Sequence, residues 1–441
     1  MRTRVLATLI GALFASGLAG TVRADDLLQY YREALKNDAQ FASARAQYIA
    51  NQEKAPQGRA GLLPTVSLSG LFSRTHSDIN NANNLANTWK NYWTTTYTLQ
   101  LTQPVFRWAN IQQEEIGKIS VVLAEAQLGQ ASQDLAVRLA QAYFDVLASE
   151  DNIAFITAQK AAITEQLASA KRNFEVGTAT ITDTNEAQAR YDLAVAAELA
   201  ARNDLDIRRT NLQQIIGRAP SGVARLRTGV ELSAPQPAAI EQWVDSAEKG
   251  NYTVLQQQAN LEISKRNVEV SRSGRYPTVD LVASRGLNRT PVTSPVIQTL
   301  SHVIGLQASV PLYTGGLAES RIRESLALVD KSEQDLENSK RVAAQAARQA
   351  FFGVNSGMAQ VKALQAAETS SLTALESNRL GYEVGVRINI DVLNAQQQLF
   401  QTRRDLSRAR YDTLMNSLRL KAAAGILKEE DLAQINGLLD R

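Results

Sequence analysis

Two aspartates follow two glycine-containing turns, and their positions suggest helix capping. Asp183 comes six residues after Gly177, and Asp391 comes six residues after Gly385. Glycine readily takes the left-handed backbone that ends a helix, and an aspartate at the next helix start can accept hydrogen bonds from free N–H groups. The run Asp183-Thr184-Asn185-Glu186 has the pattern of a capping box. Both segments therefore predict two helices joined by a tight turn.

The chain shows no catalytic or metal-binding pattern. It has no cysteine and two histidines, His76 and His302, which lie near expected strands. A His-Glu-x-x-His pair, a phosphate-binding glycine loop ending in Lys and a Gly-x-Ser-x-Gly elbow are all absent. Acidic residues are scattered along helical segments, where charge is usually solvated. We therefore predict a protein that is not an enzyme and needs no metal or cofactor.

The two turns belong to an internal repeat. Phe174-Glu175-Val176-Gly177 recurs as Tyr382-Glu383-Val384-Gly385, an offset of 385 − 177 = 208. Gln103-Pro104-Val105-Phe106 recurs as Val310-Pro311-Leu312-Tyr313. The order of these signals is the same in both halves. We predict a signal peptide at 1–24, a first repeat at 25–232, a proline-containing linker at 233–237, a second repeat at 238–425 and a C-terminal segment at 426–441.

The repeats differ in polarity at two positions beside the turns. Arg387 stands where the first repeat has Ala179, and Tyr382 stands where the first repeat has Phe174, which lacks the hydroxyl. Folding makes similar demands on both repeats. Polar groups present in the second repeat alone therefore indicate a role beyond folding.

Four segments alternate between apolar and polar residues with the period of a β-strand. One apolar and one polar face suit a strand that lies between lipid and an aqueous lumen, although a half-buried soluble sheet alternates in the same way. The residues expected on one face are Val66, Leu68, Gly70 and Phe72; Trp93, Thr95, Tyr97, Leu99 and Leu101; Val279, Leu281 and Ala283; and Ile304, Leu306, Ala308, Val310 and Leu312.

Long helical segments set the scale of the molecule. No proline occurs from Trp108 to Asn173, and a helix of this length would extend about 100 Å. A matching segment runs from Glu319 to Arg379. Shorter helices are expected at 27–59 and 183–216, where together they could run beside the long helix. Each repeat thus predicts helix, strand, strand, long helix, turn and helix.

The N-terminus and the charge balance favour an exported protein that does not bind nucleic acid. Arg2 and Arg4 precede an apolar stretch, and Val22-Arg23-Ala24 has small residues at the cleavage positions. Removing Arg2, Arg4 and Arg23 leaves 47 − 3 = 44 basic residues against 44 acidic ones. A nucleic-acid-binding protein would need a surplus of basic residues.

Four strands are too few to close a barrel, because the smallest closed membrane barrels have about eight. Open strand edges in lipid would leave backbone groups unpaired. Other chains must therefore complete the barrel, and a homotrimer supplies twelve strands.

This pattern resembles the TolC family of outer-membrane channel proteins over the whole chain after residue 24. The most specific match is the run from Tyr382 to Gln396, supported by Gly177 to Ala189 and by the proline-bearing strand starts. The resemblance implies a mostly α fold with a small β part: a homotrimeric 12-stranded transmembrane β-barrel continued by a long α-helical coiled-coil barrel. It places 233–237 and the C-terminal segment in an equatorial collar.

The same resemblance implies a location and partners. The chain would lie in the cell outer membrane with a large periplasmic portion. It would act as the passive exit duct of a tripartite system for drug efflux or type I secretion. An inner-membrane transporter and a periplasmic adaptor would engage the tips of its helix pairs, so that Gly177 and Gly385 would mark the docking turns.

Gate residues follow from the resemblance one position at a time. Asp391 matches an aspartate that lines the pore constriction, and Asn394 stands where the family often has a second one. Tyr382 and Arg387 match residues that tether the inner coiled coil to its neighbour. The matching acceptors are Thr182 and Asp183. For Asp183 and Asp391, helix capping is an alternative role compatible with gating.

Two other functions would use many of the same features. A periplasmic coiled-coil scaffold without a pore would explain the helices but would have no use for amphipathic strands. An independent diffusion porin is disfavoured, because most of the chain is helical.

Overall fold

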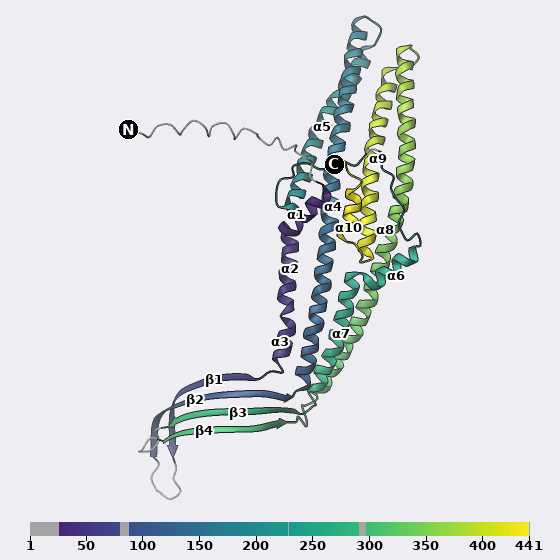
Figure 1. Ribbon diagram of the computed structural model, residues 1–441. Helices are drawn as coiled ribbons and strands as arrows, with labels where there is room; N and C mark the ends of the chain where they lie inside the picture. The colour runs from purple at the N-terminus through teal and green to yellow at the C-terminus, as the bar shows by residue number, and fades with distance from the viewer. Residues whose placement is uncertain (1–25, 80–87, 228, 291–296, 441) are drawn as a thin grey trace, which may run out of the picture. The chain divides into compact units, whose positions relative to one another are not determined.

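The computed structural model describes residues 26–79, 88–227, 229–290 and 297–440. They form a mostly helical chain with one antiparallel sheet (Figure 1). The predicted signal peptide lies outside the described residues. The elements are α1 (Leu27–Asn37), α2 (Ala39–Gln52), α3 (Lys54–Ala60), β1 (Thr65–Ile79), β2 (Thr88–Phe106), α4 (Trp108–Glu175), α5 (Ile181–Ile216), α6 (Ile240–Gly250), α7 (Tyr252–Ser273), β3 (Thr278–Thr290), β4 (Ile297–Ser309), α8 (Leu317–Glu383), α9 (Asn389–Ala423) and α10 (Glu429–Asn436).

The strands pair in the order β1-β2-β3-β4, and each pair is antiparallel (Figure 1). The register aligns the predicted apolar residues in rows across the sheet: Leu68 pairs with Leu99, and Ala283 pairs with Ile304. The alternation predicted from the sequence is confirmed. One expectation was wrong: β4 ends at Ser309, so Val310 and Leu312 lie beyond it. Pro311 has no N–H to donate to a ladder, which disfavours continuing the strand.

The two long helices match their predicted limits closely. Helix α4 has 68 residues and α8 has 67. Both are rich in Ala, Gln, Leu and Glu, which favour helix. Among the described residues, no helix is both long enough and apolar enough to cross a membrane.

The predicted helix at 27–59 is divided into α1, α2 and α3, and Asp38 explains the first break. Its carboxylate accepts a hydrogen bond from the Phe41 amide at 2.7 Å and pairs with Arg138 of α4 at 3.1 Å. Asp38 itself has an extended backbone and is 4% exposed. A buried carboxylate needs such partners, and serving them interrupts the helix.

Two compact units share the chain, and each takes residues from both predicted repeats. The first contains residues up to 42, 131–247 and 344–441; the second contains 43–130 and 248–343. The repeat limits, the linker and the C-terminal segment therefore stay predictions.

The first unit has an extensive apolar core. Its largest fully buried side chains come from helices α1, α4, α5 and α9: Leu27, Tyr30, Leu135, Leu139, Tyr143, Phe144, Leu147, Leu212, Ile216, Met415, Leu418 and Leu420. Buried tyrosines here have hydrogen-bond partners, since Tyr30 and Tyr143 donate to the carbonyls of Gly222 and Ala224. The loop after α5 is thereby fixed to this core, as is α10 through Leu432 and Ile435.

The second unit contains the sheet, and its helices approach one another closely. A Cβ added to Gly58 of α3 would come within 2.8 Å of the Gln113 carbonyl oxygen of α4. Where α4 meets β2, Arg107 makes hydrogen bonds of 2.8 and 2.6 Å to both carboxylate oxygens of Asp280 in β3. The glycine lets α3 lie against α4, and the two-point ion pair fixes the start of α4 to the sheet.

Candidate functional site

Two helical turns, one between α4 and α5 and one between α8 and α9, hold most of the residues singled out by sequence (Figure 1). Both turns lie in the first unit. Gly177 and Gly385 have φ values of 79° and 78°, which confirms the predicted left-handed backbone. The next amides then turn back on the helix: Thr178 donates to the Asn173 carbonyl at 2.8 Å, and Val386 donates to the Gly381 carbonyl at 2.9 Å. The same local signal thus produces the same backbone in both turns.

The first turn satisfies its own polar groups. Thr180 is the N-cap of α5, and its hydroxyl accepts a hydrogen bond from the Asp183 amide at 3.2 Å. The Asp183 carboxylate in return accepts from the Thr180 amide at 2.9 Å and the Thr180 hydroxyl at 2.7 Å. A capping box is present, but the predicted pairing of Asp183 with Glu186 was wrong. The helix begins earlier because Thr180 can cap it.

The second turn is built differently. Ile388 occupies the N-cap of α9 and has no side-chain oxygen that could accept a hydrogen bond. Asp391 lies in the first turn of α9, as Asp183 does in α5, and not at the cap. The Asp391 carboxylate pairs with Arg387 at 3.7 Å, and this pair is partly exposed. Within the described part of one chain, Arg387 thus meets Asp391 and not Asp183. The predicted tether between Arg387 and Asp183 remains a prediction about neighbouring chains.

Gly381 makes room for Arg387. A Cβ added to Gly381 would lie 2.7 Å from Cγ of Arg387, so the aliphatic part of the arginine packs directly on this glycine. The matching residue of the first repeat is Asn173, since 381 − 208 = 173. The α8–α9 turn therefore pairs Gly381 with Arg387, whereas the α4–α5 turn has Asn173 and Ala179 at these positions.

Tyr382 connects the two hairpins. Its hydroxyl oxygen accepts a hydrogen bond from the Asn173 side-chain amide at 3.2 Å, which joins α8 to α4. The matching Phe174 is 44% exposed and has no such group. Thr182, the other predicted acceptor, is exposed on the first turn of α5. The hydroxyl of Tyr382, which the first repeat lacks, thus forms a hydrogen bond between the two hairpins.

Asn394 has a partner that sequence reasoning missed. Arg190 of α5 donates to the Asn394 side-chain oxygen at 3.1 Å and to the Gln397 side-chain oxygen at 2.6 Å. The position matching Arg190 is Gln398, since 190 + 208 = 398, so this arginine is also special to one repeat. The same comparison that identified Arg387 could have found it.

A buried amide cluster lies close to the turns and was also missed. Asn389 and Gln396 of α9 are 1% and 2% exposed. Gln166 of α4 donates to the side-chain oxygen of Asn389, whereas Nδ2 of Asn389 and Oε1 of Gln396 have no hydrogen-bond partner in the structure. Unpaired buried polar atoms destabilise a helix interface. The contact between α4 and α9 is therefore weakened close to the two turns.

Ion pairs hold each helix of the first hairpin against its partner. Glu198 of α5 pairs with Lys160 of α4 and with Arg202, the latter at 2.6 Å. The hydrogen bond from Lys160 lowers the pKa of Glu198 below its usual value, with Arg202 adding to the effect. Small residues also pack here, since Ala170 and Ala187 are fully buried. The hairpin is thus tied internally.

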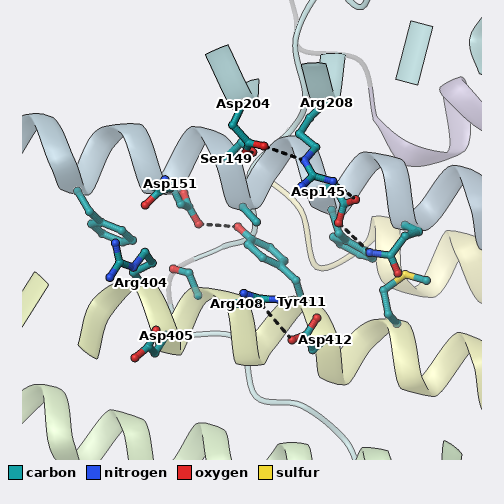
Figure 2. A pocket seen from close by; sticks show the side chains of 17 residues that line it. Asp145, Ser149, Asp151, Asp204, Arg208, Arg404, Asp405, Arg408, Tyr411 and Asp412 are labelled. Atoms are coloured by element: carbon teal, nitrogen blue, oxygen red, sulfur yellow. Dashed lines mark hydrogen bonds and ion pairs between the residues drawn. The ribbon is translucent and has the colours of Figure 1, made fainter. Parts of the chain in front are cut away.

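A polar pocket of about 350 Å³ lies farther along the first unit, between α4, α5 and α9 (Figure 2). Figure 2 shows Tyr411 directed at Asp151, to which its hydroxyl donates a hydrogen bond of 2.7 Å. Burial, and then the nearby Asp151 charge, raise the pKa of Tyr411, so the hydroxyl keeps its proton. Arg208 pairs with Asp145 at 3.2 Å and with Asp204 at 3.3 Å. Among the described residues, no group of acidic or histidine side chains could hold a metal ion.

Comparison with known proteins identifies the family. The sequence model of the family described as "Outer membrane efflux protein" matches residues 30–218 and 243–426. The chain belongs to the outer membrane efflux protein family. It is 31% identical to outer membrane protein TolC of Escherichia coli over 456 residues, which covers 99% of this chain and 90% of TolC.

Other relatives of this efflux family member are named for secretion. The chain is 31% identical to the proteases secretion protein PrtF of Dickeya chrysanthemi, covering 98% of this chain and 94% of PrtF. It is also 31% identical to the alkaline protease secretion protein AprF of Pseudomonas aeruginosa, covering 98% and 91%. The predicted resemblance to the TolC family and the location in the outer membrane are thereby confirmed. The relatives are efflux and secretion channels, not enzymes.

Solved structures share the fold. The outer membrane channel CmeC of Campylobacter jejuni superposes with a TM-score of 0.80 at 16% identity, covering 94% of this chain and 90% of CmeC. VceC of Vibrio cholerae gives 0.76 at 18% identity, covering 90% and 96%. Long helices with one small antiparallel sheet are thus the fold of outer-membrane channels.

Proposed function

We propose that three copies of this chain form the outer-membrane exit duct of a tripartite export system. The observation that carries the proposal is the four-stranded sheet with one apolar face and two open edges. Among the described residues, β1 pairs with β2 alone and β4 pairs with β3 alone. An unpaired edge in hydrocarbon costs several kcal/mol per backbone group. Three sheets joined edge to edge give a closed 12-stranded barrel and remove every edge.

Strand lengths support a membrane-spanning barrel. The strands have 15, 19, 13 and 13 residues, whereas about 9–11 residues suffice to cross the hydrocarbon layer. The faces support it too, because Leu68 and Leu99 on one face are 74% and 47% exposed. Large exposed apolar side chains on a single-layer sheet need lipid or protein against them.

The helices form the periplasmic part in this proposal. The elements α2 to α5 and α7 to α9 occur in the same order around their strands, which supports two tandem structural repeats that line one tunnel. Segments 233–237 and 426–441 contribute to the equatorial collar. No step of the transport uses chemistry of the protein, so the duct is passive and the inner-membrane pump supplies the energy.

The two turns form the gate and the docking surface. A periplasmic adaptor engages the exposed turns around Gly177 and Gly385. Asp391 and Asn394 surround the constriction, and Arg387, Tyr382, Thr182 and Asp183 tether neighbouring hairpins. The Arg387–Asp391 pair and the Asn173–Tyr382 hydrogen bond support a polar network at these turns. We add Arg190 to this network because it binds Asn394.

Mass measurement and bilayer recording of the detergent-extracted protein test the proposal. A trimer with stable single-channel conductance is expected. A monomer without conductance as the sole native form would refute the duct and favour a periplasmic scaffold. The apolar face of the strands already argues against that scaffold, which would expose it to water.

A further inference from the structure

The apolar face of the sheet carries basic side chains at its centre. Arg285 of β3 pairs in register with Leu99 of β2 on one side and with His302 of β4 on the other. The next rows on both sides are apolar: Leu101, Ala283 and Ile304 in one direction, and Tyr97, Leu287 and Leu300 in the other. A guanidinium group and an imidazole ring therefore lie inside a band that would otherwise suit hydrocarbon.

Among the strand side chains that the structure describes, no acidic one lies on the same face as Arg285 and His302. The described side chains of residues 65–77, 91–106, 278–290 and 297–309 include one carboxylate, Asp280, which lies on the opposite face and pairs with Arg107. Arg285 and His302 are both exposed. Cationic side chains on the lipid face of a barrel are unfavourable unless something neutralises them, and two donors side by side repel each other when both are charged.

Further basic residues follow toward the strand ends that lead into the segments 80–87 and 291–296. Arg289 lies on the same face of β3, four residues beyond Arg285 and opposite Thr95. Arg74 of β1 lies over the Trp93 ring at 5.8 Å, and Trp93 stacks on Phe72 at 4.6 Å. The charged face therefore continues in one direction along the strands.

The surface beside Arg285 and His302 is hollowed. A shallow pocket of about 400 Å³ is lined by both residues and by Val66, Leu99, Leu101, Ala283, Ser284, Val303 and Ile304. An apolar floor with a cationic end fits a molecule that has a hydrocarbon chain and an anionic head. A guanidinium group can hold two oxygens of one phosphate, and the imidazole can donate a further hydrogen bond.

We propose that Arg285 and His302 bind the phosphate group of an anionic membrane lipid whose acyl chain lies along Leu101, Ala283 and Ile304. The site rests on the proposed barrel, because it needs this face to meet lipid. Binding neutralises the guanidinium charge of Arg285 within the apolar band. A free phosphate ion has the same head chemistry but would leave the apolar floor uncovered.

Lipid titration of the purified protein tests the site. The full chain is extracted in nonionic detergent, stripped of lipid and titrated with phosphatidylglycerol or phosphatidylcholine under native mass spectrometry. Changing both residues, Arg285→Gln with His302→Gln, is expected to weaken phosphatidylglycerol binding about tenfold, since charge-assisted hydrogen bonds are lost. Phosphatidylcholine binding is expected to change little. Arg285→Lys keeps the charge but loses the two-point hydrogen bonding, and it should retain only part of the affinity.

The matched control is Arg348→Gln, which removes an exposed arginine from α8. It should leave phosphatidylglycerol binding unchanged. Equal phosphatidylglycerol affinity in the parent and the double variant would overturn the site, as would an equal loss in the control. Displacement of the lipid by inorganic phosphate alone at similar concentration would identify a free phosphate site and overturn the lipid as occupant.

The same spectra separate this site from the barrel proposal, because they report subunit number. If the parent and the double variant are both trimers and bind both lipids equally, only the lipid site is refuted and the trimeric duct stands. A monomer that still prefers phosphatidylglycerol through Arg285 keeps the lipid site and refutes the trimeric duct.

Discussion

The two helical turns share one backbone and differ in how their side chains are used. Both have a left-handed glycine and amides that return to the preceding helix. The α4–α5 turn closes its hydrogen bonds on itself through Thr180 and Asp183. The α8–α9 turn has an uncapped Ile388 and an exposed Arg387–Asp391 pair. The first turn thus satisfies its polar groups internally, whereas the second has exposed charged groups that can interact with another surface.

This difference indicates which hairpin can change its interaction partners more easily. A turn with internally satisfied polar groups gains little from a new neighbour. Exposed ion pairs are worth about 0–1 kcal/mol, so the second turn can exchange partners at small cost. The four predictions below test this contrast.

The largest effect is expected from valine at the turn glycines. Gly385→Val and Gly177→Val force a β-branched residue into positive φ, which is strongly disfavoured. A Cβ at either position would meet no atom within 4 Å, so the strain is in the backbone and not in packing. We expect export to be lost while trimers remain in the membrane, measured by substrate export and membrane fractionation.

The matched control is Gly229→Val, because Gly229 also has a φ of 79° and open space around it. Export by this variant should stay near normal. Normal export by the two turn variants would show that the turns are not the docking surface.

A large effect is also expected from breaking the second-turn network. Arg387→Ser with Tyr382→Phe removes the cation and the oxygen that accepts from Asn173. The two partly wet links of one chain together are worth on the order of 1 kcal/mol. Three copies acting on one equilibrium sum to about 3 kcal/mol, so the open fraction should rise roughly a hundredfold. Resting conductance in a bilayer, together with antibiotic sensitivity, measures the leak.

Ala179→Arg provides the control for this pair, since it adds an arginine at the matching site of the first turn. Combined with the double variant, it should not restore closure. If the double variant conducts like the parent, the closed state depends on packing and the contrast between the turns has no role in gating.

A moderate effect is expected from each of the two aspartates, on a different property of the protein. In the proposed trimer, Asp391→Ala removes three carboxylates from the proposed constriction and should lower cation selectivity a few-fold, because the local negative potential falls. Asp183→Ala should leave selectivity unchanged but destabilise the start of α5 by about 1 kcal/mol, since the capping box is lost. Reversal potentials and thermal unfolding measure the two effects. Unchanged selectivity in Asp391→Ala would leave that residue with its helical role alone.

The smallest effect is expected from Gly381→Ala. The new Cβ would meet Cγ of Arg387 at 2.7 Å, so the arginine must shift away from its present position. Alanine also favours helix by up to about 1 kcal/mol over glycine. We expect a stable trimer with a slightly raised resting conductance. Gly305→Ala, where a Cβ meets nothing within 4 Å, is the control; an equal leak in both variants would exclude a positioning role for Gly381.

Periodicity in the sequence was enough to predict the main elements, whereas the resemblance to the family rested on the run from Tyr382 to Gln396. Alternation in β1 to β4 defines two faces, because side chains of a strand point to opposite sides in turn. Proline-free segments gave α4 and α8 to within a few residues at either end. The glycines of both turns are equally local signals, because few other residues accept positive φ. Comparison of the repeats identified Tyr382 and Arg387 as unusual.

Contacts between distant residues were decided by the tertiary structure. Asp38 divides the first helix because Arg138, 100 residues away, provides its partner. Arg190 reaches Asn394, and Gln166 reaches Asn389, across more than 200 residues. Such pairs depend on the rotation and axial position of each helix against its neighbour, which local pattern does not specify. The sequence by itself therefore determined the elements and their faces, whereas packing of the helices determined which polar groups meet.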